Sequence, residues 1–202
     1  MYLSDIDIKK AVNAGEITLS DFDVKRLQPV SYDILLGNKF FLTETHTDGF
    51  IDPHRRKFPQ AREIHIKDNE QFVLHPGVSV LAWSRDYFGS SEYLIQLSGK
   101  SSLARIGLIV HNTAGIVNPG DYLNITLELF NLNSIPIILH PGMEIAQLTF
   151  SRISSKPGVE YSRPAGRYVD EQVRSKKSGP KVSKQVAKKN KKKKKQAVKR
   201  KK

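Results

Sequence analysis

Residues 96–131, QLSGKSSLARIGLIVHNTAGIVNPGDYLNITLELFN, contain the features from which the fold is predicted. Two short apolar runs, Gly107–His111 and Leu123–Phe130, are separated by polar residues and by the turn dipeptide Pro119-Gly120. Short apolar runs bounded by turn residues are typical of β-strands. The stretch therefore predicts two strands of a β-sheet joined by a connection rich in turns.

The same pattern continues in both directions along the chain. No helical period of useful length appears between about residues 30 and 160. The turn residues Gly37 and Asn38 are expected to end the first additional strand. Many short strands with frequent turns predict a mainly β fold, a closed barrel or a jelly-roll-like sandwich. These further predicted strands are Tyr32–Leu36, Phe72–Leu74, Val78–Trp83, Tyr93–Leu97, Ile135–Leu139 and Glu144–Phe150.

A short helix is predicted at the N-terminus. Ser4 can cap it, and acidic residues follow in its first turn. Ile8 and Val12 share one face, and Gly15 provides a stop signal. We expect this helix to be structural.

Two segments of the chain echo one another. Residues 72–80 read FVLHPGVSV and residues 137–145 read IILHPGMEI. In both, a predicted strand enters a Leu-His-Pro-Gly turn and another strand leaves it. The segments are either equivalent hairpins of one scaffold or unrelated turns with the same favourable chemistry.

The net charge of +13 is unevenly distributed. Residues 174–202 contain 16 of the 33 Lys and Arg and no acidic residue, so the other residues hold 33 − 16 = 17 basic and 20 acidic side chains. We therefore predict a globular domain over residues 1–173 and a disordered basic tail over residues 174–202. The tail either makes non-specific contact with nucleic acid or another polyanion, or is a solubilising extension.

The chain contains no cysteine, which excludes a disulfide framework and any zinc site built on thiolates. The absence of cysteine also favours a reducing, cytoplasmic setting. No apolar run approaches the roughly 20 residues that span a bilayer, and the N-terminus lacks the features of a signal peptide. We expect a cytoplasmic protein without membrane contact.

The sequence Gly99-Lys100-Ser101-Ser102 is a candidate phosphate-binding loop. A glycine lets the backbone approach an anion, lysine supplies charge, and hydroxyl groups donate to phosphate oxygens. It is not a P-loop, because that motif needs a glycine at the position of Leu94. An ordinary surface turn remains an alternative.

Glu128 is the candidate catalytic carboxylate. On a strand, Leu127 and Leu129 face one side and Glu128 the other, together with Thr126 and Phe130. A carboxylate is costly to bury among apolar side chains, because burial disfavours its charged form. A carboxyl group in such a place can take up and release a proton, as a general acid or base must. A surface glutamate of a barrel is the alternative.

Arg105 is the candidate partner of Glu128, which it could pair with and keep ionised, or it is part of a surface ion pair. Other catalytic classes are excluded or poorly supported. Zinc nucleobase deaminases need cysteine ligands. The six histidines lack close metal-binding spacing, and no Gly-x-Ser-x-Gly elbow occurs.

Together these motifs resemble those of the dCTP deaminase family, whose members share the trimeric dUTPase-like fold. The resemblance covers about residues 1–172. It implies a dUTPase-like distorted β-barrel. The matching segments follow the family's order: Gln28–Gly37, Gly99–Gly107, Thr113–Gly115, Pro119-Gly120 and Thr126–Leu129.

The resemblance implies roles for individual residues. Glu128 matches the general acid/base, and Ser101, Arg105 and the carbonyl group of Ala114 match groups that position the water. Substrate-binding positions are matched by Lys100, Ser101, Ser102, Leu103, Ala104, Arg105, Asn118, Thr126, Leu127, Glu128, Gln147, Tyr161, Arg167 and Gln172. The last three belong to a C-terminal segment that closes over the nucleotide, with Glu171 as the alternative to Gln172. The resemblance further implies a homotrimer with shared sites, Mg²⁺ arriving with the triphosphate, and no zinc.

The product of the reaction is predicted from single positions at which members of the family differ from one another or from this sequence. Gly115 and Gln147 favour the bifunctional type, which converts dCTP to dUMP and diphosphate. Asn118 replaces the family's usual Asp and disfavours that second step, because an amide is no base. We therefore predict deamination of dCTP to dUTP, with the bifunctional activity as the first alternative. A diphosphatase without deamination, or a nucleotide-sensing or nucleic-acid-binding protein that uses the basic tail, is less favoured.

Overall fold

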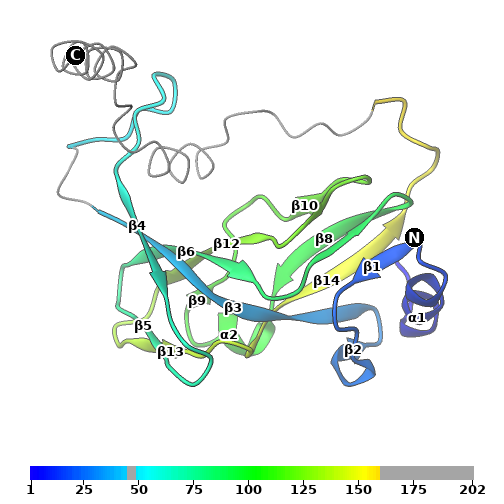
Figure 1. The fold of residues 1–202 in the computed structure, drawn as a ribbon, viewed down its shortest axis with the longest axis horizontal. Coiled ribbons are helices and arrows are strands. Elements are labelled where there is room, and N and C mark those ends of the chain that lie inside the picture. Colours follow the sequence, from blue (N-terminus) through cyan, green and yellow to red (C-terminus); the bar gives the residue numbers. More distant parts are fainter. Residues whose placement is uncertain (45–48, 160–202) are drawn as a thin grey trace, which may run out of the picture.

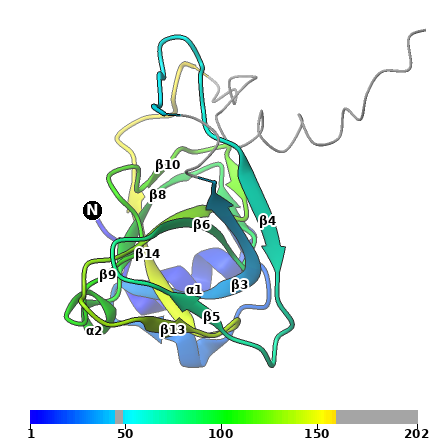
Figure 2. The same ribbon diagram turned by 90° about the vertical axis from the view of Figure 1, so that its left-hand side faces the viewer.

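In residues 1–44 and 49–159, which the computed structural model describes, nine strands form one strongly curled sheet (Figures 1 and 2). Its main path runs β10-β8-β14-β3-β6-β12-β9, and β2 and β4 also pair with β3. Smaller sheets join β1, β7 and β11, and β5 with β13. The elements are α1 Asp5–Asn13, β1 Ile17–Leu19, η1 Val24–Arg26, β2 Leu27–Gln28, β3 Ser31–Thr43, β4 Ala61–His65, β5 Phe72–Leu74, β6 Ser79–Ser84, β7 Phe88–Ser90, β8 Tyr93–Gly99, α2 Ser101–Ala104, β9 Leu108–Ile109, β10 Ile116–Val117, β11 Tyr122–Leu123, β12 Thr126–Asn131, β13 Ile137–Leu139 and β14 Glu144–Arg152.

The long strand β3 joins the two halves of the curled sheet. Its first half pairs with β14 and its second half with β6, and the register with β6 shifts between Leu36 and Phe40. The prediction that Gly37 and Asn38 end this strand is therefore wrong. A Cβ atom on Gly37 would lie 2.8 Å from the carbonyl oxygen of Trp83, so glycine is needed for this close approach.

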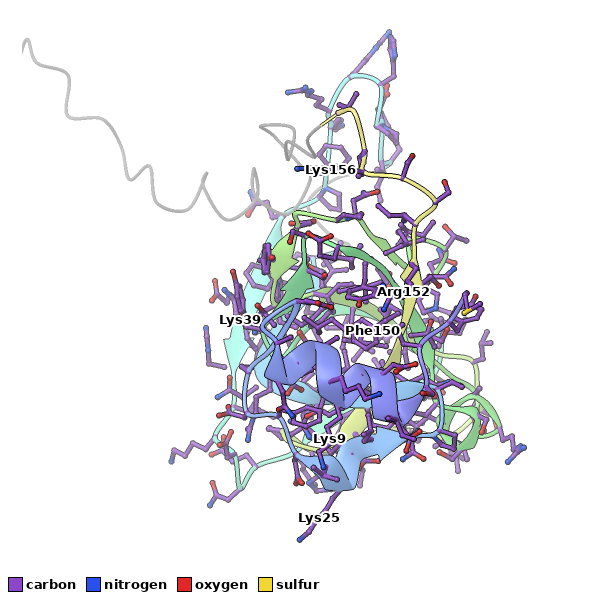
Figure 3. All side chains as sticks on the ribbon, turned by 90° about the vertical axis from the view of Figure 1, so that its right-hand side faces the viewer. Lys9, Lys25, Lys39, Phe150, Arg152 and Lys156 are labelled. Carbon is purple, nitrogen blue, oxygen red and sulfur yellow. The ribbon has the colours of Figure 1, made fainter. Side chains whose placement is uncertain are left out.

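The hydrophobic core lies inside the curled sheet. Alternate residues of β8 and β12 point inward, and Leu127 and Leu129 of β12 are fully buried there. Figure 3 shows Phe150 of β14 within the body of the protein, whereas Lys25 points away from it. The core therefore follows from the two-residue period of the apolar side chains.

Helix α1 matches its prediction. The Ser4 side chain accepts a hydrogen bond from the backbone N–H of Asp7, and Gly15 follows the helix with φ +75°. Ile8 is fully buried, and the backbone N–H of Leu3 bonds to the Phe150 carbonyl at 2.9 Å. The helix is thereby fixed beside β14.

The two echoed segments are equivalent in the structure. β5 and β13 pair with each other, with Val73 opposite Ile138. Each leads into a Pro-Gly turn closed by a 3.2 Å backbone hydrogen bond, from Val78 to His75 and from Met143 to His140. The glycines have φ +70° and +82°, as type II turns require.

Some predicted boundaries differ from the observed ones. Gly107–His111 contains only β9, and Leu123–Phe130 is divided between β11 and β12. The division lies at Asn124, whose side-chain amide bonds to the carbonyl oxygens of Ser84 and Arg85. The predicted tail and its boundary at residue 173 lie outside the described residues. In the described ranges no helix has the length and apolarity needed to cross a membrane.

A buried ion pair fixes the segment before β3. Arg26 donates to Asp86 at 2.8 Å, and these side chains are 8% and 2% exposed. Asp86 also accepts the backbone N–H of Leu35 at 2.7 Å, and Arg26 donates to the carbonyl oxygens of Asp21 and Asp33. Both charges are therefore compensated by several partners.

We predict that Asp86→Asn lowers the free energy of unfolding by about 3–5 kcal/mol, because it leaves the buried Arg26 charge uncompensated. Urea denaturation measures the change. The control is Asp68→Asn, which removes a pair with Arg85 whose side chains are 39% and 65% exposed. It should cost at most about 1 kcal/mol. Equal losses in the two variants would contradict the prediction.

Candidate active site

Glu128 stands on the outward face of β12. Leu127 and Leu129 point into the core, and Glu128 lies half-buried opposite Leu81 of β6. One carboxylate oxygen, Oε2, accepts the backbone N–H of Asn112 at 3.2 Å. The alternation is as predicted, and among the described residues the carboxylate is held by a backbone N–H and not by a cation.

Residues 111–115, which include the Asn112 N–H bonded to Glu128, are fixed in place by Gly115. The backbone N–H of Leu97 donates to the Gly115 carbonyl at 2.7 Å. A Cβ atom on Gly115 would lie 2.7 Å from the Leu97 carbonyl oxygen and 3.2 Å from the His111 ring. Ala114, predicted to position water, is exposed beside it. Glycine thus permits the close approach that keeps residues 111–115 against β8.

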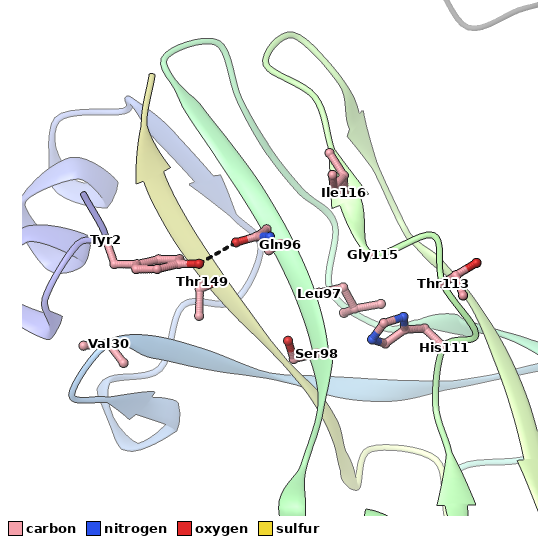
Figure 4. Close-up of a pocket in the computed structure, with 10 residues that line it drawn as sticks. All are labelled: Tyr2, Val30, Gln96, Leu97, Ser98, His111, Thr113, Gly115, Ile116 and Thr149. Atoms are coloured by element: carbon pink, nitrogen blue, oxygen red, sulfur yellow. Dashed lines mark hydrogen bonds between the residues drawn. The ribbon is translucent and has the colours of Figure 1, made fainter. Parts of the chain in front are cut away.

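A cleft of about 520 Å³ lies beside this segment (Figure 4). Side chains of β8 form one wall, and the hydroxyl of Tyr2 donates to Gln96 at 2.9 Å across it. Its volume suits a small ligand. Glu128, Arg105 and Ser101 do not line it. The lining residues are Tyr2, Val30, Gln96, Leu97, Ser98, His111, Thr113, Gly115, Ile116 and Thr149.

Lys100 lies in a cluster of charged groups at the end of β8. Its Nζ is 2.5 Å from Oδ2 of Asp33 and 2.6 Å from Oε2 of Glu144. Burial alone would lower the pKa of Lys100, but the hydrogen bonds to these two carboxylates outweigh it and raise the pKa above its ordinary value. The predicted phosphate ligand is therefore a fully charged ammonium that already has two acidic partners.

Polar groups from neighbouring strands complete this cluster. Gln28 donates to Oδ2 of Asp33 at 3.1 Å. The hydroxyl of Ser31 donates to Gln147 at 3.2 Å, and Gln147 lies opposite Asp33 in the sheet. The predicted residues Lys100 and Gln147 are thus brought to the same place.

The loop after Lys100 presents its side chains outward. Ser101, Ser102, Ala104 and Arg105 are exposed, and Leu103 is packed against the core. Within the described residues the guanidinium of Arg105 makes no hydrogen bond or ion pair with Glu128. The predicted pairing of Arg105 with Glu128 therefore does not occur within one chain.

Asn118 begins a tight turn between β10 and β11. The backbone N–H of Asp121 donates to the Asn118 carbonyl at 3.0 Å, and Gly120 has φ +87°. Thr126 is half-buried and Leu127 is buried. The predicted residues Tyr161, Arg167 and Gln172 lie outside the described part of the chain.

The sequence could have indicated one missed residue. Asp33 interrupts the apolar strand of Tyr32 and Ile34, the same signal that identified Glu128. Glu144 and Asn112 act through contacts made by the fold and give no such signal. Among residues 1–44 and 49–159, no group of three or more His, Cys, Asp or Glu side chains is arranged to hold a metal ion.

Comparison with known proteins gives a consistent family match. The family model described as dCTP deaminase-like matches residues 2–153. A protein of Tropheryma whipplei named "dCTP deaminase, dUMP-forming" is 42% identical over 171 residues, which cover 83% of this chain and 87% of that protein. Proteins of the same name from Beutenbergia cavernae and Streptomyces avermitilis are each 40% identical, covering 84% and 83% of this chain and 87% and 90% of theirs.

A solved structure also shares the fold. The match to the 2'-deoxycytidine 5'-triphosphate deaminase of Agrobacterium tumefaciens has a TM-score of 0.56 at 19% identity. It covers 74% of this chain and 47% of that chain, so this chain spans about half of that protein's length. The predicted mainly β, dUTPase-like fold with a short N-terminal helix is thereby confirmed.

We predict that Gly115→Ala displaces residues 111–115 and lowers the free energy of unfolding by about 1–3 kcal/mol, because the added methyl group meets the Leu97 carbonyl oxygen and the His111 ring. Hydrogen exchange should show faster exchange at the amides of Leu97 and Asn112. Gly49→Ala is the matched control, since a Cβ atom there has nothing within 4 Å. Unchanged protection at both amides would argue against the role assigned to Gly115.

Proposed function

The chain belongs to the dCTP deaminase family, and from this membership we propose that it deaminates dCTP and releases dUMP and diphosphate. The observation that carries the proposal is Glu128, a half-buried carboxylate held by the Asn112 N–H on an apolar strand. The dUTP product favoured by Asn118 is less well supported. The relatives at 40–42% identity are named dUMP-forming, and one amide does not outweigh them.

Hydrolytic deamination requires two proton transfers from the attacking water. The water loses its first proton as it adds to C4 of cytosine, and this proton goes to N3. The hydroxyl group now on C4 loses the second proton to the amino group, which leaves as ammonia while C4 becomes a carbonyl. Glu128 can serve each step, because one oxygen accepts the Asn112 N–H and the other stays available for proton transfer. Fixed dipoles of the protein, such as the Asn112 N–H at Glu128, would stabilise the charges that develop during the reaction.

The second step cleaves the bond between the α- and β-phosphates by addition of water. Lys100, Ser101 and Ser102 supply a cation and exposed hydroxyl groups to the triphosphate, and Gln147 lies beside them. Asn118 can still hydrogen-bond the sugar hydroxyl. Mg²⁺ would enter with the nucleotide and reduce its charge, which suits a protein whose described residues contain no metal-ligand cluster. Tyr161, Arg167 and Gln172 are proposed to close over the nucleotide.

A homotrimer would complete the site. Arg105 and Ser101 are exposed, and neither makes a hydrogen bond or ion pair with Glu128 in the described part of one chain, so a neighbouring subunit can bring them to it. Each site then consists of Glu128 and Ala114 from one subunit and the residues 101–105 from another.

We predict that Glu128→Gln lowers ammonia release from dCTP by about 10²- to 10⁴-fold, because the amide cannot transfer protons. Arg105→Ala should also be inactive. After equal amounts of the two variants are unfolded and refolded together, about a quarter of the shared sites carry neither substitution, so activity should return to that level.

The control mixes each inactive variant with Glu70→Gln, an exposed substitution away from the site. If the Glu128 and Arg105 variants mixed together remain inactive, then the site lies within one chain. Full ammonia release by Glu128→Gln alone would overturn the assigned role of Glu128.

The products test the second activity. With dCTP and Mg²⁺, we predict one diphosphate and one dUMP for each ammonia, without accumulation of dUTP. Chromatography of the nucleotides and an assay for diphosphate measure the ratio. Accumulating dUTP without diphosphate would show that Asn118 leaves only the deamination step.

A further inference from the structure

The position of Glu144 follows from the strand order. β14 lies between β3 and β8, with Glu144 opposite Leu35 and Ala146 opposite Gly99. The register between β14 and β3 shifts at Glu144 and Ala146, at the very start of the strand. This irregularity brings the Glu144 carboxylate to the ammonium of Lys100.

The charges at Lys100 do not suit direct capture of a polyanion. One ammonium meets two carboxylates, at 2.5 and 2.6 Å, so the cluster carries a net negative charge when all three groups are ionised. A triphosphate approaching Lys100 would be repelled by the carboxylates that hold it. For Lys100 to bind phosphate, one carboxylate must give up its place.

The two carboxylates differ in how readily they can leave. The Asp33 side chain is 2% exposed, and its Oδ2 also accepts a hydrogen bond from Gln28. Freeing it would leave a buried, uncompensated charge. The Glu144 side chain is 44% exposed and can turn into water at little cost. Asp33 is therefore the permanent partner and Glu144 the exchangeable one.

We propose that Glu144 is a positioning residue that competes with the substrate's triphosphate for Lys100 and thereby sets the affinity for phosphate. While Glu144 is bound, it keeps the ammonium in a defined place beside Asp33. When phosphate oxygens arrive, they replace Glu144, and Asp33 continues to hold Lys100. The inference rests on the proposed function, since it assumes that the triphosphate is bound at Gly99–Ser102.

The test compares Glu144→Gln with wild type by calorimetry, using inorganic triphosphate and, separately, deoxycytidine. Removing the competing charge should lower the Kd for triphosphate about two- to fivefold. The Kd for deoxycytidine, which has no phosphate, should stay the same; a role of Glu144 in structure alone would not separate the two ligands. Glu70→Gln, with a carboxylate that is 48% exposed and pairs with Lys67, is the matched control and should change neither value.

An unchanged or higher Kd for triphosphate in Glu144→Gln would overturn the proposal, as would equal shifts for both ligands or no triphosphate binding by either protein. The measurement does not depend on turnover. Tighter triphosphate binding by Glu144→Gln, in a protein that releases no ammonia from dCTP, would support the role of Glu144 while refuting the proposed function.

Discussion

The close approach of β3 to β6 at Gly37 is the constraint on which the rest of the structure depends. A side chain there would collide with the Trp83 carbonyl, and without the approach β3 could not change partners from β14 to β6. Its first half carries Asp33 and so anchors Lys100. Its second half aligns β6, which in turn aligns β12 and Glu128. One strand therefore positions both chemical groups that each chain contributes.

The sequence predicted the presence of the strands better than their limits. Alternation in Thr126–Asn131 identifies a strand because burial of one face is recorded in every second residue. Its start depends on Asn124, whose amide bonds to carbonyl groups 39 and 40 residues away. The same is true of Gly37, which looks like a turn residue in isolation but serves the contact with Trp83. Helix α2, Ser101–Ala104, is too short to have a recognisable period.

The sequence predicts a site residue where a charged side chain interrupts an apolar strand. Glu128 interrupts an apolar strand, and Asp33 does so equally, although only Glu128 is predicted as a site residue. The partners of Lys100 were not predictable, because positions 33, 100 and 144 meet only through the order β3-β14-β8. For Arg105, in contrast, the sequence predicts a pairing with Glu128 that the described residues do not contain. The two side chains form no hydrogen bond or ion pair within the described part of one chain.

The two carboxylates of the site are held in different ways, and the difference matches different tasks. Asp33 is buried against an ammonium, which suits it to holding Lys100 in place. Within residues 1–44 and 49–159, Glu128 accepts a single backbone N–H and has no cationic partner, so one of its oxygens stays free to exchange protons. A cation beside Glu128 would favour the ionised form alone and make protonation of the leaving group harder. If a neighbouring subunit supplies Arg105, then Glu128 gains a cation only in the assembled site. There the positive charge of Arg105 is shared between Glu128 and the bound nucleotide.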